Sequence, residues 1–325
     1  MIAKNMCCKL SRTSMVRNRR EVWYQYLAKG LKDIGFQCSE VDGCVFYFGR
    51  SVLLVYVDDS ILMGPKEEEL NYLIAEMNKR FKLQEEGSVS QFLGIEIKKE
   101  DDGGLYLSQP QLIDSILSDL KLDGTNVKSR STPALKTRIL HKDEGGKPFD
   151  NSFHYHSILG KLNYLEKSTR PDISHAVHQY SRFSSCPMDS HAMAIRYIAQ
   201  YLAGTRNKGI RIKPSKKGFE CYVDASHAGD WKQLSAIDDP LTARSRTGYI
   251  INFADSPILW VSKLQTEIAL STTEAEYIAL STSTRDILPI LSLAKEASEH
   301  KLIVRTTVAP WRWQMFLKCD LVQSI

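Results

Sequence analysis

The sequence predicts a multidomain protein of mixed α+β and α/β class, and three regions of different pattern support this. Apolar, β-branched runs flank an acidic pair in residues 51–64, which favours a β-hairpin. Residues 155–210 carry apolar side chains at helical spacing, and residues 219–262 return to strand-forming runs before a last helix. With 325 residues and 43% hydrophobic content, the chain is long enough to build two or three such domains.

Composition narrows the class of protein without deciding its function. A net charge of +5 suits a nucleic-acid partner, but many ordinary enzymes share it. The seven cysteines show no CxxC or Cys/His spacing, so we expect free thiols and no zinc site. No apolar run approaches the roughly 18 residues of a membrane span, so no membrane partner is expected. Residues 1–20 are basic like a mitochondrial presequence but lack a clean amphipathic period, so an irregular leader is expected.

Helices and strands can be assigned on both sides of the acidic pair. Residues 21–35 carry apolar side chains from Trp23 to Leu31 at helical spacing and end in glycine, which predicts an amphipathic helix. Residues 36–48 then lead through an irregular turn into a strand. Beyond the hairpin, residues 65–81 predict a second, charged amphipathic helix.

The next segment predicts another hairpin, a helix and a linker. Residues 92–98 and 105–107 alternate as strands around Asp101 to Gly104, so we expect the two acids there to form a turn and not a metal site. Residues 109–120 predict a helix. Residues 124–146 are polar, basic and turn-rich, which indicates a linker.

The acidic pair Asp58 and Asp59 is the first candidate site. A hairpin over residues 51–64 raises both carboxylates at its tip. Hard ions such as Mg²⁺ are held by carboxylate oxygens, and polymerases use such ions to activate an attacking 3′-hydroxyl and to steady the leaving pyrophosphate. An acidic pair in a turn is more often only a solvated turn. Tyr56 ahead of the pair and strands on both sides favour the metal-binding interpretation.

Five histidines in the helical region invite a second metal interpretation. They are His154, His156, His175, His178 and His191. No acidic residue recurs near them at ligand spacing, so we expect packed or solvated helices with incidental histidines. The apolar stripes of residues 155–210 are expected to form a core.

The last region predicts three antiparallel strands followed by a helix. Asp224 ends the first strand, and residues 247–253 and 257–262 form the other two. Ser271 to Glu274 (STTE) is a capping box, in which Glu274 is expected to accept a hydrogen bond from the N-cap amide. Glu276 lies about 200° around the helix axis from Glu274 and must face something else.

One further expectation concerns the last helix. Pro289 lies inside it, and proline lacks the backbone N–H that the helical ladder needs. We therefore expect the helix to kink or restart there.

Together these segments resemble the copia-type family of long-terminal-repeat retrotransposon Pol polyproteins. Before the YVDD tip the matching residues read D-x-C-V-F-Y at 42–47, and after it they read FLG at 92–94. TRPDI at 169–173 and YLAGT at 201–205 match the family's connection region. The segments YVDAS, TGYI, LWVSK and LSTTEAEYIAL resemble its ribonuclease H. Each motif is weak alone, but together they are specific.

The resemblance implies an organisation for the whole chain. It implies a partial reverse-transcriptase palm at 1–64, a thumb-like region and linker at 65–146, and a helical connection at 147–215. A ribonuclease H-like mixed sheet with helices, incomplete at its C-terminal end, would occupy 216–325.

The resemblance also implies sites and partners. It assigns Asp58, Asp59, Asp224 and Glu276 as catalytic carboxylates that hold Mg²⁺ or Mn²⁺, and it implies that Asp224 and Glu276 share an ion. The implied partners are an RNA template, a DNA primer and an RNA–DNA hybrid, in a cytoplasmic virus-like particle or the nucleus. The implied activities are RNA-directed DNA synthesis and cleavage of the RNA strand of hybrids.

Departures from the family pattern lead us to expect impaired activity. The family's fourth-strand Asp aligns with Lys318, and Asp320 lies two residues beyond it. The family's earlier palm Asp and final ribonuclease H ligand have no counterpart here, so we expect no primer extension. Two alternatives stay open: a non-catalytic nucleic-acid-binding remnant, or a ribonuclease H-like nuclease alone. Metal titration separates them, because a binder keeps its affinity in chelator.

Overall fold

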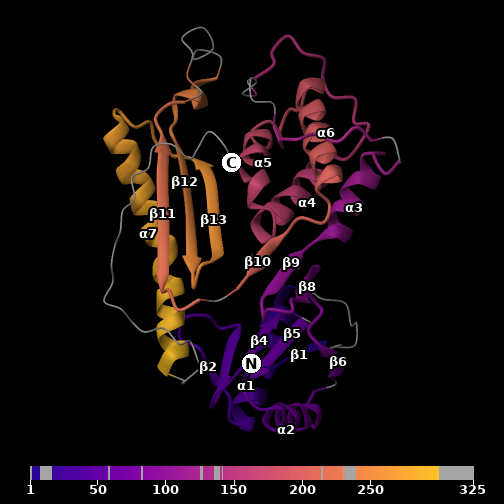
Figure 1. Cartoon of the computed structure of the whole chain (residues 1–325), viewed down its shortest axis with the longest axis vertical. Helices are drawn as coiled ribbons and strands as arrows, with labels where there is room; N and C mark the ends of the chain where they lie inside the picture. The colour runs from indigo at the N-terminus through magenta and orange to yellow at the C-terminus, as the bar shows by residue number, and fades with distance from the viewer. Residues whose placement is uncertain are drawn as a thin grey trace. The chain divides into compact units, whose positions relative to one another are not determined.

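The fold combines helices with antiparallel sheets, as the sequence predicts. A computed structural model describes residues 2–7, 17–57, 59–81, 83–124, 127–134, 140, 142–213, 215–229, 231 and 239–299. The chain forms two compact units, one of Met1–Leu93 with Asp286–Arg305 and one that includes Gly94–Arg285 (Figure 1). The finer boundaries at residues 64, 146 and 215 stay predictions.

The first unit is built on a six-stranded sheet with the strand order β2-β3-β4-β5-β1-β6. Its strands are β1 (Ile2–Cys7), β2 (Gln37–Cys38), β3 (Val45–Phe48), β4 (Ser51–Tyr56), β5 (Asp59–Gly64) and β6 (Gln84–Ser88), and β7 (Gln91–Phe92) follows them. The neighbouring strands pair antiparallel. The predicted hairpin of residues 51–64 is therefore present as β4 and β5.

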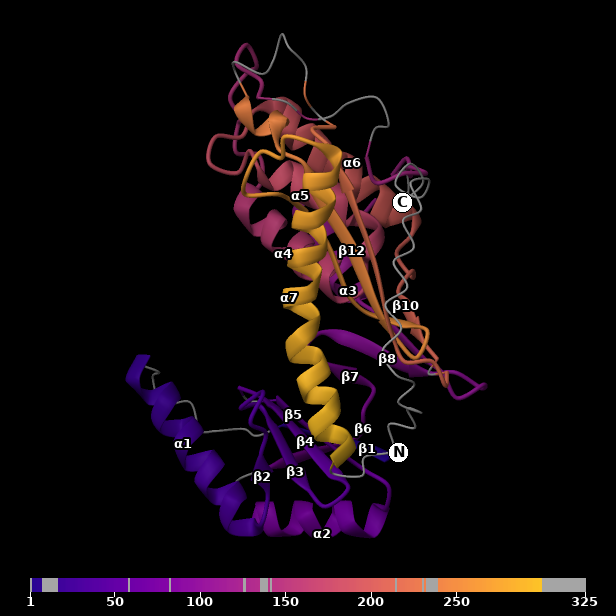
Figure 2. The same cartoon turned by 90° about the vertical axis from the view of Figure 1, so that its left-hand side faces the viewer.

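Two helices cover one face of this sheet (Figure 2). They are α1 (Arg17–Ile34), which ends at Gly35 with φ +108°, and α2 (Glu67–Asn78). Leu31 of α1 and Leu70 of α2 are fully buried in one cluster with Leu53 and Leu62 of the hairpin. The apolar faces of both helices thus pack against the base of the hairpin.

The expectation of an irregular leader over residues 1–20 is wrong for two segments of it. Ile2–Cys7 forms β1, which inserts between β5 and β6, and residues 17–20 begin α1. A strand edge offers a row of unpaired N–H and C=O groups to any extended segment, so backbone pairing needs no amphipathic pattern to place β1.

The second unit contains a helical core. Its helices are α3 (Pro110–Asp119), α4 (Tyr155–Ser168), α5 (Ser174–Ser181) and α6 (Asp189–Gly204), with short 3₁₀ turns at Pro171–Ile173 and Pro240–Ala243. Ile113, Leu162, Leu165, Val177 and Ile195 are fully buried together in its core. The apolar stripes of residues 155–210 are therefore core, as predicted.

A small sheet in the second unit contains the predicted Asp-Asp-Gly-Gly turn. β8 (Ile95–Lys99) and β9 (Leu105–Ser108) form the hairpin, and β10 (Ile210–Ile212) pairs with β9. Asp102 accepts a hydrogen bond from the Gly104 amide at 3.1 Å and pairs with Lys213 at 2.6 Å. The hydrogen bonds from Lys213 and Gly104 lower the pKa of Asp102 to about 2. The prediction that these acids form a turn is confirmed.

The last region forms a three-stranded antiparallel sheet with a long helix (Figure 1). The strands are β11 (Phe219–Ser226), β12 (Arg246–Phe253) and β13 (Ser256–Leu264), and α7 spans Thr272–Glu299. Helix α7 continues through Pro289, so the expected restart is wrong, and the expected kink stays a prediction. Lys318 and Asp320, the two residues considered for the family's fourth-strand Asp, lie outside the described residues.

A buried polar cluster joins the segments TRPDI and YLAGT. Arg170 is 1% exposed and donates hydrogen bonds to both carboxylate oxygens of Asp172, at 2.9 and 2.7 Å. It also donates to the Thr205 carbonyl at 3.0 Å and to the Thr205 hydroxyl at 2.8 Å. Tyr201 donates to Asp172 at 2.7 Å. Burial opposes ionisation of Asp172, but these hydrogen bonds outweigh it and lower its pKa.

The neighbouring residue extends this cluster to another element. The Thr169 hydroxyl donates to the Gln109 side chain at 2.9 Å, and both residues are buried. Gln109 directly precedes α3, so the cluster ties the start of α3 to the ends of α4 and α6. These motif residues therefore have a structural role.

Arg170→Lys should lower the free energy of unfolding by roughly 2–4 kcal/mol, because an ammonium cannot replace the guanidinium fork and leaves buried acceptors unpaired. Urea denaturation followed by circular dichroism measures this change. The matched control is Arg206→Lys, which breaks an equivalent pair with Asp114 whose side chains are 42% and 48% exposed. The control should lose at most about 1 kcal/mol. Equal losses in both variants would contradict the structural role.

Candidate functional site

The hairpin of β4 and β5 has a strained tip. Tyr56 pairs with Asp59 across the hairpin, and Val57 lies in the turn that follows Tyr56. Val57 has φ +53°, a left-handed conformation that is unfavourable for a β-branched residue. The side chains of Tyr56 and Val57 are 58% and 50% exposed. Asp58 itself lies outside the described residues.

Asp59 begins β5 and is half-buried. On its other side β5 pairs with β1, where Cys7 lies opposite Asp59. The sequence of β1 contains no Asp or Glu, so this neighbouring strand adds no carboxylate. Of the predicted pair, the structure therefore places Asp59 near the tip of a hairpin whose base is buried, beside the exposed Tyr56.

The second pair of predicted carboxylates comes together in the other unit. Asp224 lies near the end of β11, and Glu276 lies near the start of α7. The carboxylate of Glu276 accepts a hydrogen bond from the backbone N–H of Ala225. Burial and then the nearby charge of Asp224 raise the pKa of Glu276, against the effect of the Ala225 hydrogen bond. The structure thus brings Asp224 and Glu276 near each other across the strand and the helix.

Helix α7 starts after the predicted N-cap Ser271, but the amide bound by Glu274 differs from the prediction by one residue. Ser271 accepts a hydrogen bond from the Glu274 amide at 3.1 Å, as an N-cap should. However, the Glu274 carboxylate accepts from the Leu270 amide at 2.7 Å and not from the N-cap amide that we predicted. Glu274 is therefore used in capping and Glu276 is directed to β11, which agrees with the angular argument.

Asp224 and Glu276 offer the oxygen ligands that hard divalent ions prefer. Both are half-buried, and their mutual repulsion would be relieved by a cation between them. Over the described residues, no group of three or more His, Cys, Asp or Glu side chains is placed to hold a metal ion. The chemistry fits one loosely held ion, to which other oxygen ligands must be added.

Histidine packing agrees with the sequence interpretation. The Nδ1 atom of His191 accepts a hydrogen bond from the Met188 amide at 3.0 Å, at the start of α6. Its ring stacks on Phe183 with 4.1 Å between centroids. His178 lies 3.6 Å from the buried carboxylate of Glu166. His191 is therefore packed and buried, and His178 is partly exposed beside Glu166.

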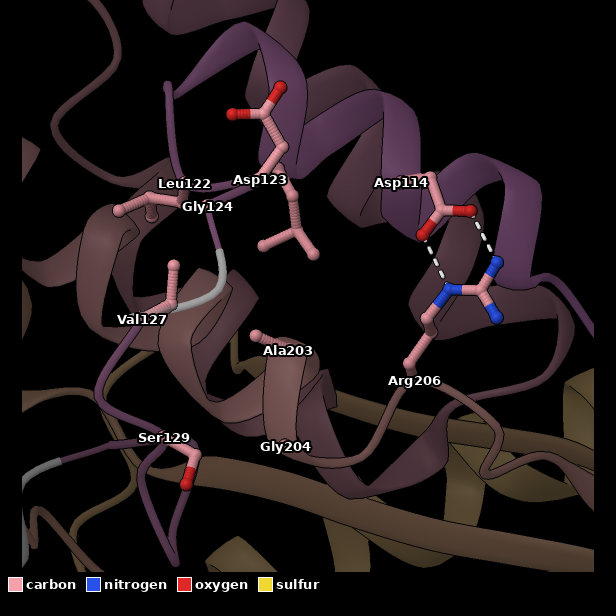
Figure 3. A pocket seen from close by; sticks show the side chains of 10 residues that line it. Asp114, Leu122, Asp123, Gly124, Val127, Ser129, Ala203, Gly204 and Arg206 are labelled. Carbon is pink, nitrogen blue, oxygen red and sulfur yellow. Dashed lines mark hydrogen bonds and ion pairs between the residues drawn. The ribbon is translucent and has the colours of Figure 1, made fainter.

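A cavity of about 360 Å³ opens beside α3 and the end of α6 (Figure 3). Leu117, Leu122, Val127 and Ala203 give it an apolar lining. At its rim Arg206 and Asp114 form a two-bond ion pair, so their charges cancel locally. None of the predicted site residues lines this cavity.

Comparison with known proteins shows what this chain resembles. A family model described as reverse transcriptase (RNA-dependent DNA polymerase) matches residues 2–136. The retrovirus-related Pol polyprotein from transposon RE1 of Arabidopsis thaliana is 35% identical over 298 residues, which are 90% of this chain and 19% of that protein. The corresponding polyprotein from transposon TNT 1-94 of Nicotiana tabacum is 32% identical over 92% of this chain and 22% of its own length. The chain belongs to the copia-type Pol polyprotein family.

Another relative of this Pol chain is a shorter protein. An uncharacterized mitochondrial protein of Arabidopsis thaliana is 32% identical over 237 residues, which are 72% of this Pol chain and 92% of that protein. Against the two transposon polyproteins, this Pol chain spans about a fifth of their length (19% and 22%). In its described part, no helix combines the length and apolar character needed to cross a membrane.

Sequence reasoning missed two contributors to the second site. One is the backbone N–H of Ala225, which holds Glu276. The other is the buried side chain of Gln265, which contacts the start of α7. A backbone donor carries no sequence signal, and a lone Gln after a strand is indistinguishable from a surface residue by pattern.

Glu276→Gln should stabilise this Pol chain at neutral pH by up to about 1 kcal/mol, since the site is partly solvated. A raised pKa means that the folded chain binds the proton more tightly than the unfolded chain. The stability that protonated Glu276 contributes is therefore full below its ordinary pKa of 4.5 and is lost as pH rises through the raised value. The melting-temperature gain of the variant should vanish near pH 3.5. A gain that persists unchanged there would contradict the assigned cause.

Proposed function

We propose that this Pol chain forms part of a reverse transcriptase and ribonuclease H that acts on RNA–DNA hybrids. Its partners would be an RNA template and a DNA primer, in a cytoplasmic virus-like particle or the nucleus. The observation that carries the polymerase half is the Tyr56–Asp59 hairpin, which lies inside the segment matched by the reverse-transcriptase family model. The exposed tip with an anchored base suits a site that meets a large substrate.

Asp58 and Asp59 would hold Mg²⁺ or Mn²⁺ in this proposal. The ion would supply charge stabilisation for the attacking 3′-hydroxyl and the leaving pyrophosphate. The chain's own contribution is placement. Leu53 and Leu62 bury the hairpin base, and the pairing of Tyr56 with Asp59 extends the hairpin to its tip. The exposed Tyr56 ring would pack against the substrate next to the metal-binding carboxylates.

A second activity, ribonuclease H, is favoured by the meeting of Asp224 and Glu276. Three antiparallel strands followed by a helix hold these carboxylates beside the Ala225 amide. In this role they would bind a divalent ion that activates water against the RNA strand. The Ala225 hydrogen bond orients the Glu276 carboxylate before any ion arrives.

We further propose that RNA cleavage is weak for a local reason. Cleavage by two metal ions needs them bridged roughly 4 Å apart. Lys318 would bring a positive charge to the position where the family has an Asp, and so repel the second ion. A slip of two residues would let Asp320 replace that Asp, since strand side chains repeat every two residues.

The polymerase proposal predicts a metal-dependent ternary complex. With Mg²⁺, a nucleotide complementary to the template should slow dissociation of a labelled RNA-template–DNA-primer duplex at least several-fold. Asp59→Asn should abolish that effect because it removes a metal ligand, and a mismatched nucleotide is the matched control. Stopped-flow fluorescence measures the rate. A non-catalytic binding remnant would release the duplex equally fast with either nucleotide and in chelator.

The cleavage proposal predicts a repairable defect. Lys318→Asp should raise cleavage of a labelled RNA–DNA hybrid by at least tenfold over the unmodified chain, because it restores an oxygen ligand in place of a repelling charge. Gel analysis of RNA products measures it, with Asp224→Asn in the Lys318→Asp background as control. Strong activity in the unmodified chain that Asp320→Asn removes would show instead that the slip occurs.

A further inference from the structure

Gln265 is a buried residue that contacts two elements of the second site, β12 and α7. It directly follows β13 and is 4% exposed. Its side-chain Nε2 donates to the Thr247 hydroxyl of β12 at 3.1 Å and to the Ala275 carbonyl of α7 at 2.8 Å. Its backbone N–H donates to the Ser245 carbonyl at 2.8 Å. One amide group therefore bridges the sheet and the first turn of α7.

These contacts link the backbone next to Glu276 to the strand residues next to Asp224. Ala275 directly precedes Glu276, so the Gln265 bond holds the backbone that carries this carboxylate. Thr247 is the cross-strand partner of Ala225 on β11. The Ala225 N–H in turn donates to the Glu276 carboxylate. A chain of hydrogen-bonded and paired residues thus runs from Glu276 to β11, then to β12 and Gln265, and ends on α7 at the residue before Glu276.

We propose that Gln265 is a positioning residue that sets the separation between Asp224 and Glu276 for a shared divalent cation. The proposal rests on the ribonuclease H function proposed above. At the first turn of α7, Gln265 spans the junction between helix and sheet by hydrogen bonds to both. The Ala225 amide also connects this turn to β11, but it does so through the Glu276 carboxylate, which must also bind the cation.

The choice of glutamine follows from its donors. The Nε2 group carries two hydrogens and satisfies two acceptors at once, one on each element. Glutamate has nearly the same shape but cannot donate when ionised, and methionine fills similar space without any donor. The Oε1 atom of Gln265 is buried with no hydrogen-bond partner in the described part of the chain. Burying an unpaired carbonyl oxygen is unfavourable. The favourable contribution of this side chain therefore comes from its two Nε2 hydrogen bonds.

The experiment compares Gln265→Met and Thr247→Val with the unmodified chain in two measurements. The first is Mn²⁺ binding by titration calorimetry, for which loss of a residue that orients metal ligands typically lowers affinity about 10–100-fold. The second is hydrogen exchange of the Ala225 amide in the metal-free chain by NMR. Gln265→Met should lower Mn²⁺ affinity within that range and speed Ala225 exchange, and Thr247→Val should do both to a smaller extent.

A matched control separates positioning from stability. Thr169→Val removes a buried side-chain hydrogen bond of similar length, to Gln109, at a place remote from Asp224 in the sequence and in a different cluster. It should lower the melting temperature without changing Mn²⁺ affinity or Ala225 exchange. If Gln265→Met lowers only the melting temperature, as the control does, the proposal is wrong.

The two proposals fail in different ways. If the unmodified chain binds no Mn²⁺, or if Asp224→Asn leaves its affinity unchanged, the metal site and the ribonuclease H proposal fail. The Ala225 measurement still tests Gln265 in that case, because it needs no metal. If Gln265→Met does not fold, Thr247→Val decides, since it removes one of the two Nε2 bonds and keeps the other. Unchanged Ala225 exchange and Mn²⁺ affinity in Thr247→Val would then overturn the positioning role.

Discussion

The buried guanidinium of Arg170 joins separate elements of the larger unit. Arg170 brings its charge into the protein interior, where it must be neutralised and every donor must find an acceptor. Asp172 supplies the charge, and Thr205 supplies two oxygens from the end of α6. Because these acceptors come from separate elements, satisfying Arg170 fixes how α4 and α6 end. The core of α3 to α6 packs around that arrangement.

The two candidate sites use the same physical device at different places. Each carboxylate lies where a strand or helix begins or ends, so backbone groups near it are not all used in regular pairing. At the hairpin tip the loop leaves Asp59 beside exposed Tyr56. At the start of α7 the Ala225 amide holds Glu276 while Glu274 caps the helix. The ends of strands and helices thus set both the position of these carboxylates and the polarity of their surroundings.

Much of this arrangement could be predicted, and the exceptions have physical causes. Side-chain periodicity predicts the β4–β5 hairpin, the strands β11 to β13 and the helical core, because these elements bury one face. Periodicity says nothing of β1, which joins the sheet by backbone pairing. Angular position predicted that Glu276 faces away from the cap. Long-range contacts such as that of Gln265 with Ala275 have no local signal and require the structure.

The conformation of Val57 has a consequence for which residues the hairpin tip tolerates. A non-glycine residue at φ +53° carries a strain on the order of 1–3 kcal/mol, which glycine would avoid. Glycine would also give the unfolded chain more freedom, so the two effects partly offset each other. A valine there contributes little to folding and gives the tip a rigid apolar surface. Replacing Val57 therefore changes the exposed surface of the tip more than it changes the packing of the hairpin.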